Sequence, residues 1–424
     1  MLTAGDLIEL AIERPAAGGR MIARHEGQIV LVSGGIPGER VKARVEKVER
    51  RVAFAIVVDV IEASPDRRDP IHDPLCGGCL YAHITGDRQR AIKGEVIADA
   101  FARIGKHTLT VPVDVAASPE HGYRMRARLH VRNGRAGFYR EGSHELCDAA
   151  GTGQLAAETL SAVARVVESL TRSGALVSSL EIAENIPADQ RAIFVEISGS
   201  RRLTPSNLES LVGESIQSVV AATPDGSRTS AGAAGISDSL STITEGRGEG
   251  ELARTAESFF QANRFLLPKL VTKVIDSVLP EGEVLDLYAG VGLFAVSLAA
   301  SGRSGVTAVE APGASGSDLQ RNAAGFAGRV TAVVAPVERH LARGRQLPPT
   351  VIVDPPRTGI SKTVLDHLAA HGGTRIVYVS CDPPTLARDA RGLFDGGYRL
   401  EAIRAFDLFP NTPHVEAVGV FERS

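Results

Sequence analysis

The chain has 424 residues, a net charge of −3 and an apolar fraction of 43%. This length leaves room for about three domains with hydrophobic cores of their own. The near-neutral charge gives no sign of overall attraction to nucleic acid, and no apolar run is long enough for a transmembrane helix. Because the N-terminus lacks signal-peptide features and four cysteines are too few for a disulfide scaffold, we expect a cytoplasmic protein. We also expect a monomer without a membrane partner.

Short apolar segments separated by glycine-rich turns occupy residues 1–62. Val41, Ala43 and Val45 alternate with charged residues, which is the pattern of a half-buried strand. Five such segments predict a small β-barrel of the oligonucleotide-binding kind. A generic β cap with solvated charges is the alternative, since basic and acidic residues are balanced in this segment.

A polar, proline-containing connection then leads into Cys76-Gly-Gly-Cys79. Two thiols at this spacing can bind a metal or a cluster, or act as a redox pair, and Cys147 is a candidate third ligand. A closed cluster site needs a fourth ligand, which His72 or Asp73 would have to supply. Reduced thiols in a glycine-rich turn are the alternative to a metal site.

The middle of the chain, residues 63–255, has a mixed α and β pattern and contains the most basic run. Between Tyr123 and Arg140 there is no acidic residue, and Arg124, Arg126 and Arg128 alternate so that they share one face of a predicted strand. A run that carries arginines and aromatic rings but no acidic residue favours an RNA-binding surface. A solvated strand face is the other interpretation.

The last third of the chain shows strands that alternate with helices, which predicts a doubly wound α/β sheet. A buried strand ends in a glycine loop, residues 286–295, and Glu310 ends the next strand. Glycines at such a turn let the backbone approach a nucleotide-like ligand, and a carboxylate at Glu310 can accept hydrogen bonds from ribose hydroxyls. A nicotinamide dehydrogenase is disfavoured because Ala295 stands where the third glycine would be.

Three further reactive side chains lie next to predicted strands. Asp354 ends one strand, Cys381 ends its neighbour before two prolines, and the segment from Phe409 to Glu416 precedes the last strand. Because such ends face one crevice of a doubly wound sheet, we expect the thiol and the two carboxylates to converge. A buried structural cysteine is the alternative for Cys381 alone.

These motifs together resemble the S-adenosylmethionine-dependent RNA (uracil-5-)-methyltransferases. The resemblance extends over nearly the whole chain and divides it into three domains, which are a TRAM-like barrel (1–62), a central RNA-binding α+β domain with the cysteine motif (63–255) and a Rossmann-like methyltransferase domain (256–424). It rests on Phe259-Phe-Gln-Ala-Asn263, Asp286-Leu-Tyr-Ala-Gly-Val-Gly292, Asp318-Leu-Gln-Arg-Asn322, Asp354-Pro-Pro-Arg-Thr-Gly359, Ser380-Cys-Asp-Pro383 and His414-Val-Glu416.

The resemblance implies roles for individual residues. It makes Cys381 the nucleophile and Glu416 the base, and it places Arg124, Arg126 and Arg128 in the RNA-binding region. Many relatives hold a 4Fe-4S cluster with four cysteines, of which Cys76, Cys79 and Cys147 match three, but Pro70 stands where the first would be. The residues implied to line the S-adenosylmethionine and target-base pocket are Gln261, Tyr288, Gly290, Glu310 and Asp354, the last also counted as catalytic.

The implied activity is methylation of uridine C5 in structured RNA, either tRNA or 23S rRNA, through a covalent adduct between Cys381 and C6. Uracil C5 is a poor nucleophile, and addition of a thiolate at C6 activates it. The alternatives are a methyltransferase of another pyrimidine position, such as cytosine C5, and an RNA-binding relative without catalysis.

Overall fold

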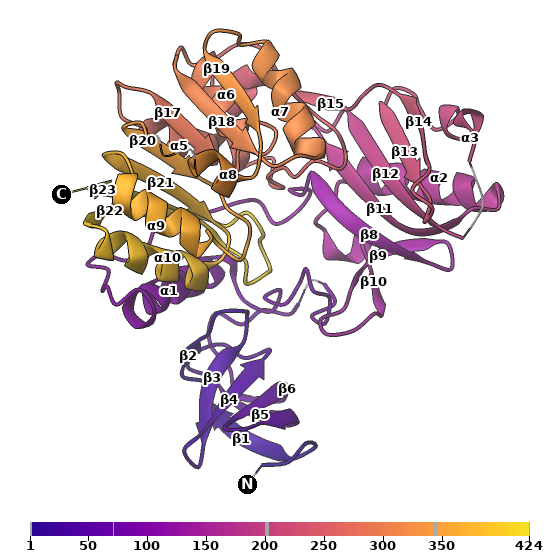
Figure 1. Ribbon diagram of the computed structural model, residues 1–424. Helices are drawn as coiled ribbons and strands as arrows, with labels where there is room; N and C mark the ends of the chain where they lie inside the picture. The colour runs from indigo at the N-terminus through magenta and orange to yellow at the C-terminus, as the bar shows by residue number, and fades with distance from the viewer. Residues whose placement is uncertain (1, 71, 200–202, 343, 345, 424) are drawn as a thin grey trace.

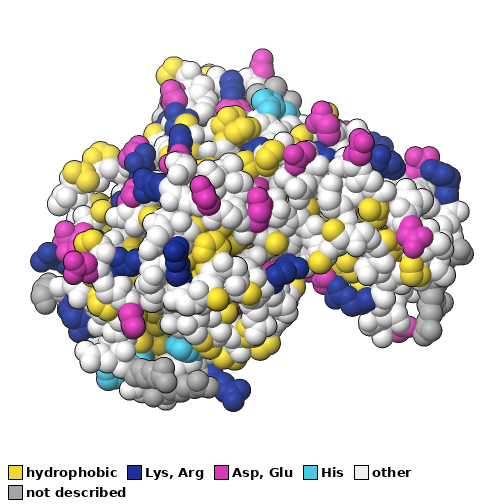
Figure 2. Space-filling model, turned by 90° about the horizontal axis from the view of Figure 1, so that it is seen from above, with side chains coloured by type: hydrophobic (Ala, Val, Ile, Leu, Met, Phe, Trp, Pro, Cys, Tyr) yellow, Lys and Arg dark blue, Asp and Glu magenta, His cyan; other side chains and the backbone are white. Residues whose placement is uncertain are grey.

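The computed structural model describes residues 2–70, 72–199, 203–342, 344 and 346–423. The N-terminal strands form a lobe of their own, and two larger lobes contain the middle and the last third of the chain (Figure 1). Within the described ranges, no helix is long and apolar enough to cross a membrane. Positive and negative side chains are interspersed on the face shown in Figure 2, in keeping with the small net charge.

The N-terminal lobe is a six-stranded sheet in the order β1-β5-β6-β4-β3-β2. Alternate residues of β1 and β5 are buried, as the alternating sequence predicts. Its core joins Val30, Val41 and Val45. The strands are β1 Leu7–Ala11, β2 Arg14–Pro15, β3 Met21–His25, β4 Gln28–Ser33, β5 Arg40–Glu49 and β6 Val52–Glu62.

The middle lobe is a seven-stranded sheet in the order β10-β9-β8-β11-β12-β13-β14, with α2 packed on one face. Its strands are β8 Arg126–Arg132, β9 Arg135–Tyr139, β10 Leu146–Asp148, β11 Leu176–Glu184, β12 Arg191–Ser198, β13 Ser218–Ala222 and β14 Arg228–Gly232. Helical segments are η1 Ala150–Thr152, α2 Ala157–Arg172 and α3 Pro205–Glu209. A ribbon of β15 Ile236–Ser239 and β16 Glu251–Arg254, with α4 Leu240–Ile243 between them, leads to the last third.

The C-terminal lobe is an eight-stranded sheet in the order β19-β18-β17-β20-β21-β23-β22-β7. Strands β17 to β21 are parallel, and β23 is antiparallel to both of its neighbours. The order reverses at β17, which confirms the predicted doubly wound, Rossmann-like sheet. The strands are β17 Val284–Leu287, β18 Val306–Glu310, β19 Val330–Val334, β20 Thr350–Val353, β21 Arg375–Ser380, β22 Tyr398–Phe406 and β23 Glu416–Arg423.

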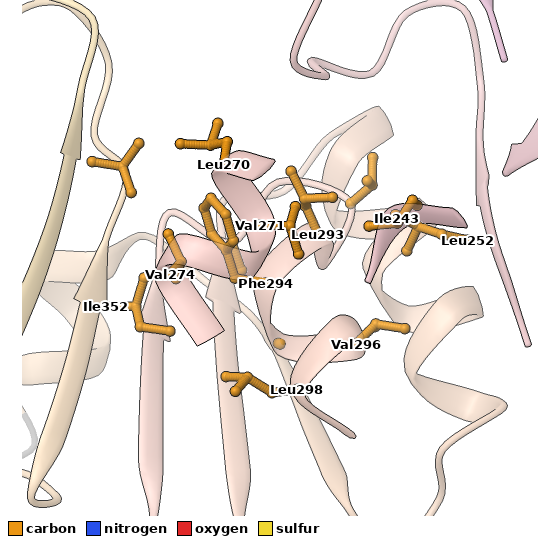
Figure 3. Close-up of a cluster of buried hydrophobic side chains, with 14 of the residues drawn as sticks. Ile243, Leu252, Leu270, Val271, Val274, Leu293, Phe294, Val296, Leu298 and Ile352 are labelled. Carbon is orange, nitrogen blue, oxygen red and sulfur yellow. The ribbon is translucent and has the colours of Figure 1, made fainter. Parts of the chain in front are cut away.

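Helices cover both faces of this sheet because its strands are apolar on both sides. One face packs against α5 Leu267–Ser277, α6 Leu293–Ala300 and α7 Ala314–Ala324. Figure 3 shows Leu270 and Val274 of α5 beside Phe294 of α6 and Ile352 of β20. The other face packs against α1 Gly86–Arg103, α8 Val337–Leu341, α9 Lys362–His371 and α10 Pro383–Asp395.

A segment from the first half of the chain completes the C-terminal lobe. Helix α1 packs on α10, and β7 Val115–Ala116 adds a parallel strand beside β22. In Figure 1, α1 lies under α10, far from the sheet of the middle lobe. Residues 86–116, which the sequence places in the central domain, therefore pack with the methyltransferase-like sheet.

Candidate functional site

The glycine loop between β17 and α6 is held in a conformation that side chains rarely adopt. Tyr288, Gly290 and Gly292 all have positive φ, at 62°, 58° and 93°. A Cβ at Gly292 would lie 2.9 Å from a Leu319 methyl, so both the backbone angle and the packing require glycine there. This turn places the start of α6 at the carboxyl edge of the central strand, where doubly wound sheets bind ligands.

Polar groups from three segments surround this loop. The backbone N–H of Gly290 donates to the Glu310 carboxylate at 2.8 Å, which fixes Glu310 at the end of β18. The Gln261 amide donates to Asp354 at 3.5 Å. Aromatic, amide and carboxylate side chains therefore line one pocket, and such a set suits a ligand with a sugar and a cationic centre; the pocket contains Phe259, Phe260, Gln261, Tyr288, Gly290 and Asp354.

The structure brings the predicted nucleophile and base together. Ser380 of β21 pairs with Ala417 of β23, so the next position of each strand sets Cys381 opposite Glu416. Residues opposite one another in an antiparallel pair have Cα atoms about 5 Å apart. Asp354 follows β20, the other neighbour of β21, and the three side chains therefore lie at one edge of the sheet.

Burial controls the protonation of these three groups. Burial and then the charge of Glu416 raise the pKa of the Cys381 thiol to about 12. Burial raises the pKa of Asp354 to about 7, and burial followed by the charge of Asp354 raises the pKa of Glu416 well above its usual value. Cys381 is therefore a thiol at neutral pH, and the two carboxyl groups hold their protons more strongly than exposed ones do.

One cation opposes this effect. The exposed guanidinium of Arg357 lowers the pKa of both Cys381 and Glu416, against the larger effect of burial. Burial, followed by the charges of Arg357 and Lys93, lowers the pKa of His414 to about 4. His414 is therefore neutral, and Arg357 is the cation that favours the thiolate and carboxylate forms of the reactive groups.

The three predicted RNA-binding arginines do not form one single-signed row. Arg126 and Arg128 share the outer face of β8 as predicted, but Glu181 and Glu196 of neighbouring strands pair with them at 2.7 and 2.6 Å. Arg124 precedes β8, and its guanidinium carbon lies 5.3 Å from the ring centre of Phe138 and 5.5 Å from that of Phe409. The acidic partners lie far away in the sequence, so the local pattern could not reveal them.

The arrangement of the cysteines shows that the predicted metal site is wrong. Cys76, Cys79 and Cys147 do lie together, but Cys76 and Cys147 form a disulfide and Cys79 alone is free. No group of three or more His, Cys, Asp or Glu side chains in the described ranges is placed to hold a metal ion. An iron-sulfur cluster requires four thiolate or equivalent ligands, so the residues present do not fit one.

Comparison with known proteins identifies the family. The family model described as tRNA (Uracil-5-)-methyltransferase matches residues 345–424, and the TRAM domain model matches residues 2–58. A 23S rRNA (uracil(1939)-C(5))-methyltransferase RlmD of Alkalilimnicola ehrlichii is 34% identical over 98% of this chain and 96% of its own. The chain belongs to the RNA (uracil-5-)-methyltransferase family. An RNA methyltransferase of Streptomyces coelicolor, named as uncharacterised, is 33% identical over 99% of this chain and 93% of its own.

One solved structure has the same architecture as this chain over nearly its whole length. The tRNA (uracil-54, C5)-methyltransferase of Pyrococcus abyssi, solved in complex with S-adenosyl-L-homocysteine, superposes with a TM-score of 0.76 at 25% identity. The match covers 97% of this chain and 99% of the other. The expected family, the TRAM domain and the mixed α/β fold with a Rossmann-like sheet are thus confirmed.

Sequence reasoning missed two residues next to the site, Gln89 and Lys93. Gln89 and Lys93 are buried although they lie on a helix rich in charged residues, where solvent exposure is the usual fate. Both contact the loop that precedes Glu416. A polar residue at a buried position of a helix is the only signal that could have found them, and the helix pattern must be known first.

Proposed function

We propose that this protein transfers a methyl group from S-adenosylmethionine to C5 of a uridine in structured RNA, either tRNA or 23S rRNA, through a covalent bond between Cys381 and C6. The observation that supports this most strongly is the register of β21 and β23, which sets Cys381 opposite Glu416. Family membership supports the reaction class, and the neighbouring glycine loop supplies a pocket for the methyl donor.

Cys381 acts first. Its thiol proton passes to solvent water, with the positive charge of Arg357 favouring the thiolate, and the sulfur adds to C6 of the uracil ring. The C5–C6 π electrons then make C5 nucleophilic, with negative charge shared by O4. S-adenosylmethionine supplies an electrophilic methyl group: as the bond from C5 to this methyl forms, the methyl–sulfonium bond breaks and S-adenosylhomocysteine is the leaving group.

Glu416 completes the reaction. As a carboxylate it takes the proton from C5, after which the C5–C6 double bond forms again and the bond between Cys381 and C6 breaks. A carboxylate whose pKa is raised is a stronger base than an ordinary one, which suits removal of a carbon-bound proton. Cys381, Asp354 and Glu416 are acidic groups that lie together and share protons. We assign to Asp354 the role of holding one of these protons.

The donor pocket and the RNA surface follow from the same geometry. Gln261, Tyr288, Gly290, Glu310 and Asp354 hold S-adenosylmethionine beside the site, with Glu310 at the ribose. Arg126 and Arg128 contact RNA phosphates, whereas Arg124 acts at the edge of the reaction site beside Phe409. We keep the division into three domains at 1–62, 63–255 and 256–424 as a proposal, with α1 and β7 packed on the third.

The deciding experiment maps 5-methyluridine in total RNA from cells with and without this protein. Loss of one modified position that returns with the wild-type gene supports the proposal and identifies the RNA. An unchanged 5-methyluridine map contradicts it, and a lost 5-methylcytidine instead would assign the enzyme to cytosine.

A further inference from the structure

The loop between β22 and β23, residues 407–415, leads directly into Glu416 and contains His414. Apart from its two strands, the loop is attached to residues that come more than 300 positions earlier in the chain, including Arg68, which donates to the Asn411 side chain at 2.7 Å. The two fully buried attachments come from α1, the helix that joins the C-terminal lobe from the first half of the chain. They are polar and buried, whereas Ile97, Ala100 and Phe101 of the same helix make apolar contacts with the C-terminal lobe.

Lys93 provides the first attachment. Its ammonium forms an ion pair with Asp407, at the start of the loop, and donates a second hydrogen bond to the Phe409 carbonyl at 3.1 Å. The Lys93 and Asp407 side chains are only 1% and 5% exposed. A buried ion pair of this kind is often no more stabilising than two apolar side chains, whereas it specifies a single arrangement of the groups it joins.

Gln89, one helical turn earlier, provides the second attachment. Its amide nitrogen donates to the Asn411 side chain at 2.8 Å, and its amide oxygen accepts from the Asn411 backbone N–H at 2.8 Å. The same amide nitrogen also bonds the Tyr81 carbonyl, and the Tyr81 N–H donates to the Asn411 carbonyl at 2.8 Å. Asn411 has a positive φ of 64°, so the loop takes a tight turn at the point where Gln89 binds it.

We propose that Lys93 and Gln89 are positioning residues, which hold the 407–415 loop so that Glu416 lies opposite Cys381; this inference rests on the proposed function. Cys381 itself follows β21 and is joined to α10, so its place does not depend on the loop. Releasing the loop therefore affects removal of the C5 proton more than attack by the thiolate.

The test uses the full-length double variant Lys93→Met with Asp407→Leu. Replacing both charges by apolar groups avoids an unpaired buried carboxylate and removes the hydrogen bond to Phe409. With the RNA identified by the mapping experiment, kcat should fall on the order of 100-fold, because a misplacement of about 1 Å has that effect. The covalent protein–RNA adduct should accumulate as a slow band on denaturing gels, while affinity for S-adenosylmethionine stays unchanged.

The matched control is Arg88→Met, which removes a cation from the same helix that pairs with Glu95 and does not touch the loop. A purely structural role lowers adduct and product together, so a double variant without adduct accumulation overturns the inference. Should that variant not fold, Asn411→Gly decides in the same way, since glycine keeps the positive φ and removes the side chain bound by Gln89 and Arg68. A wild-type protein that transfers no methyl group to any RNA overturns the proposed function and the inference with it.

Discussion

Cys381 lies opposite Glu416 across the antiparallel pair of β21 and β23, one position beyond the partners Ser380 and Ala417. A parallel neighbour in place of β23 would present the start of its strand at the other edge of the sheet. The single antiparallel strand therefore brings a residue that begins a strand to the edge where all the other strands end. The following predictions depend on that arrangement.

Cys381→Ala should abolish methyl transfer, since no other group can form the bond to C6, and should leave S-adenosylmethionine binding intact. Transfer of labelled methyl groups to RNA and calorimetric titration of the donor measure the two effects. Cys79→Ala is the matched control, because Cys79 is the other free cysteine and lies in a separate cluster. Undiminished activity of Cys381→Ala would refute the covalent mechanism.

Glu416→Gln should trap the covalent adduct after methyl transfer, because an amide cannot take the C5 proton. Denaturing gels of protein incubated with RNA and S-adenosylmethionine should show a slower band that protease treatment removes. The same band must be absent from the double variant Glu416→Gln with Cys381→Ala. Repeated absence of the adduct in Glu416→Gln alone would assign the base to another group.

Asp354 should make the protein less stable as pH rises. Its pKa is about 7 when folded, above the ordinary value of 3.8, so the folded state binds more protons between about pH 4 and pH 7. Asp354→Asn should therefore stabilise the protein by up to about 4 kcal/mol at pH 8 and by much less at pH 4. Unfolding in urea at the two pH values measures the difference.

Asp6→Asn is a control of opposite sign for that experiment. Hydrogen bonds from the Thr3 backbone and side chain lower the pKa of Asp6, so its contribution to stability is present at neutral pH and is lost as pH falls. The substitution should thus destabilise the protein at neutral pH and have less effect in acid. The same pH trend in both variants would show that burial does not raise the pKa of Asp354.

Gly359→Ala should destabilise the loop that follows Asp354. Gly359 has a φ of 78°, and a Cβ there would collide with Thr385 and Asp389 of α10. The combined strain should cost at least about 2 kcal/mol and lower activity, as the loop carries Arg357. Gly142→Ala has a similar φ of 66° with no atom within 4 Å, so thermal unfolding of the two variants separates the collision from the backbone strain.

Arg128→Gln should weaken RNA binding about threefold to tenfold and reduce the dependence of affinity on salt by about one ion. Arg128 is half exposed on the outer face of β8 even though Glu196 pairs with it. Filter binding at several salt concentrations measures both quantities, with Arg172→Gln on the exposed side of α2 as the control. If the two variants have equal RNA affinity and equal salt dependence, Arg128 does not contact RNA.

Local sequence signals predicted much of the candidate site. An apolar run that stops at Cys381 before two prolines must end a strand, and the glycine loop must open a helix, because both follow from the backbone itself. The end of a strand in a doubly wound sheet is a place for ligands whatever its neighbours are. Asp354, Cys381 and Gly290 could therefore be placed at one edge without coordinates.

Tertiary structure decided the rest. Which strand stands beside β21, and in which direction, depends on pairing between distant segments, and that pairing sets Glu416 opposite Cys381. In the same way, Glu181 pairs with Arg126 across strands, and the Cys76–Cys147 disulfide replaces the expected ligand set. The burial of Lys93 is marked only by its position on the apolar face of its helix, and a charged residue there stays exposed unless another part of the chain covers it. The sequence by itself determined the strand ends and the reactive groups upon them, whereas only the packing of remote segments determined which groups meet.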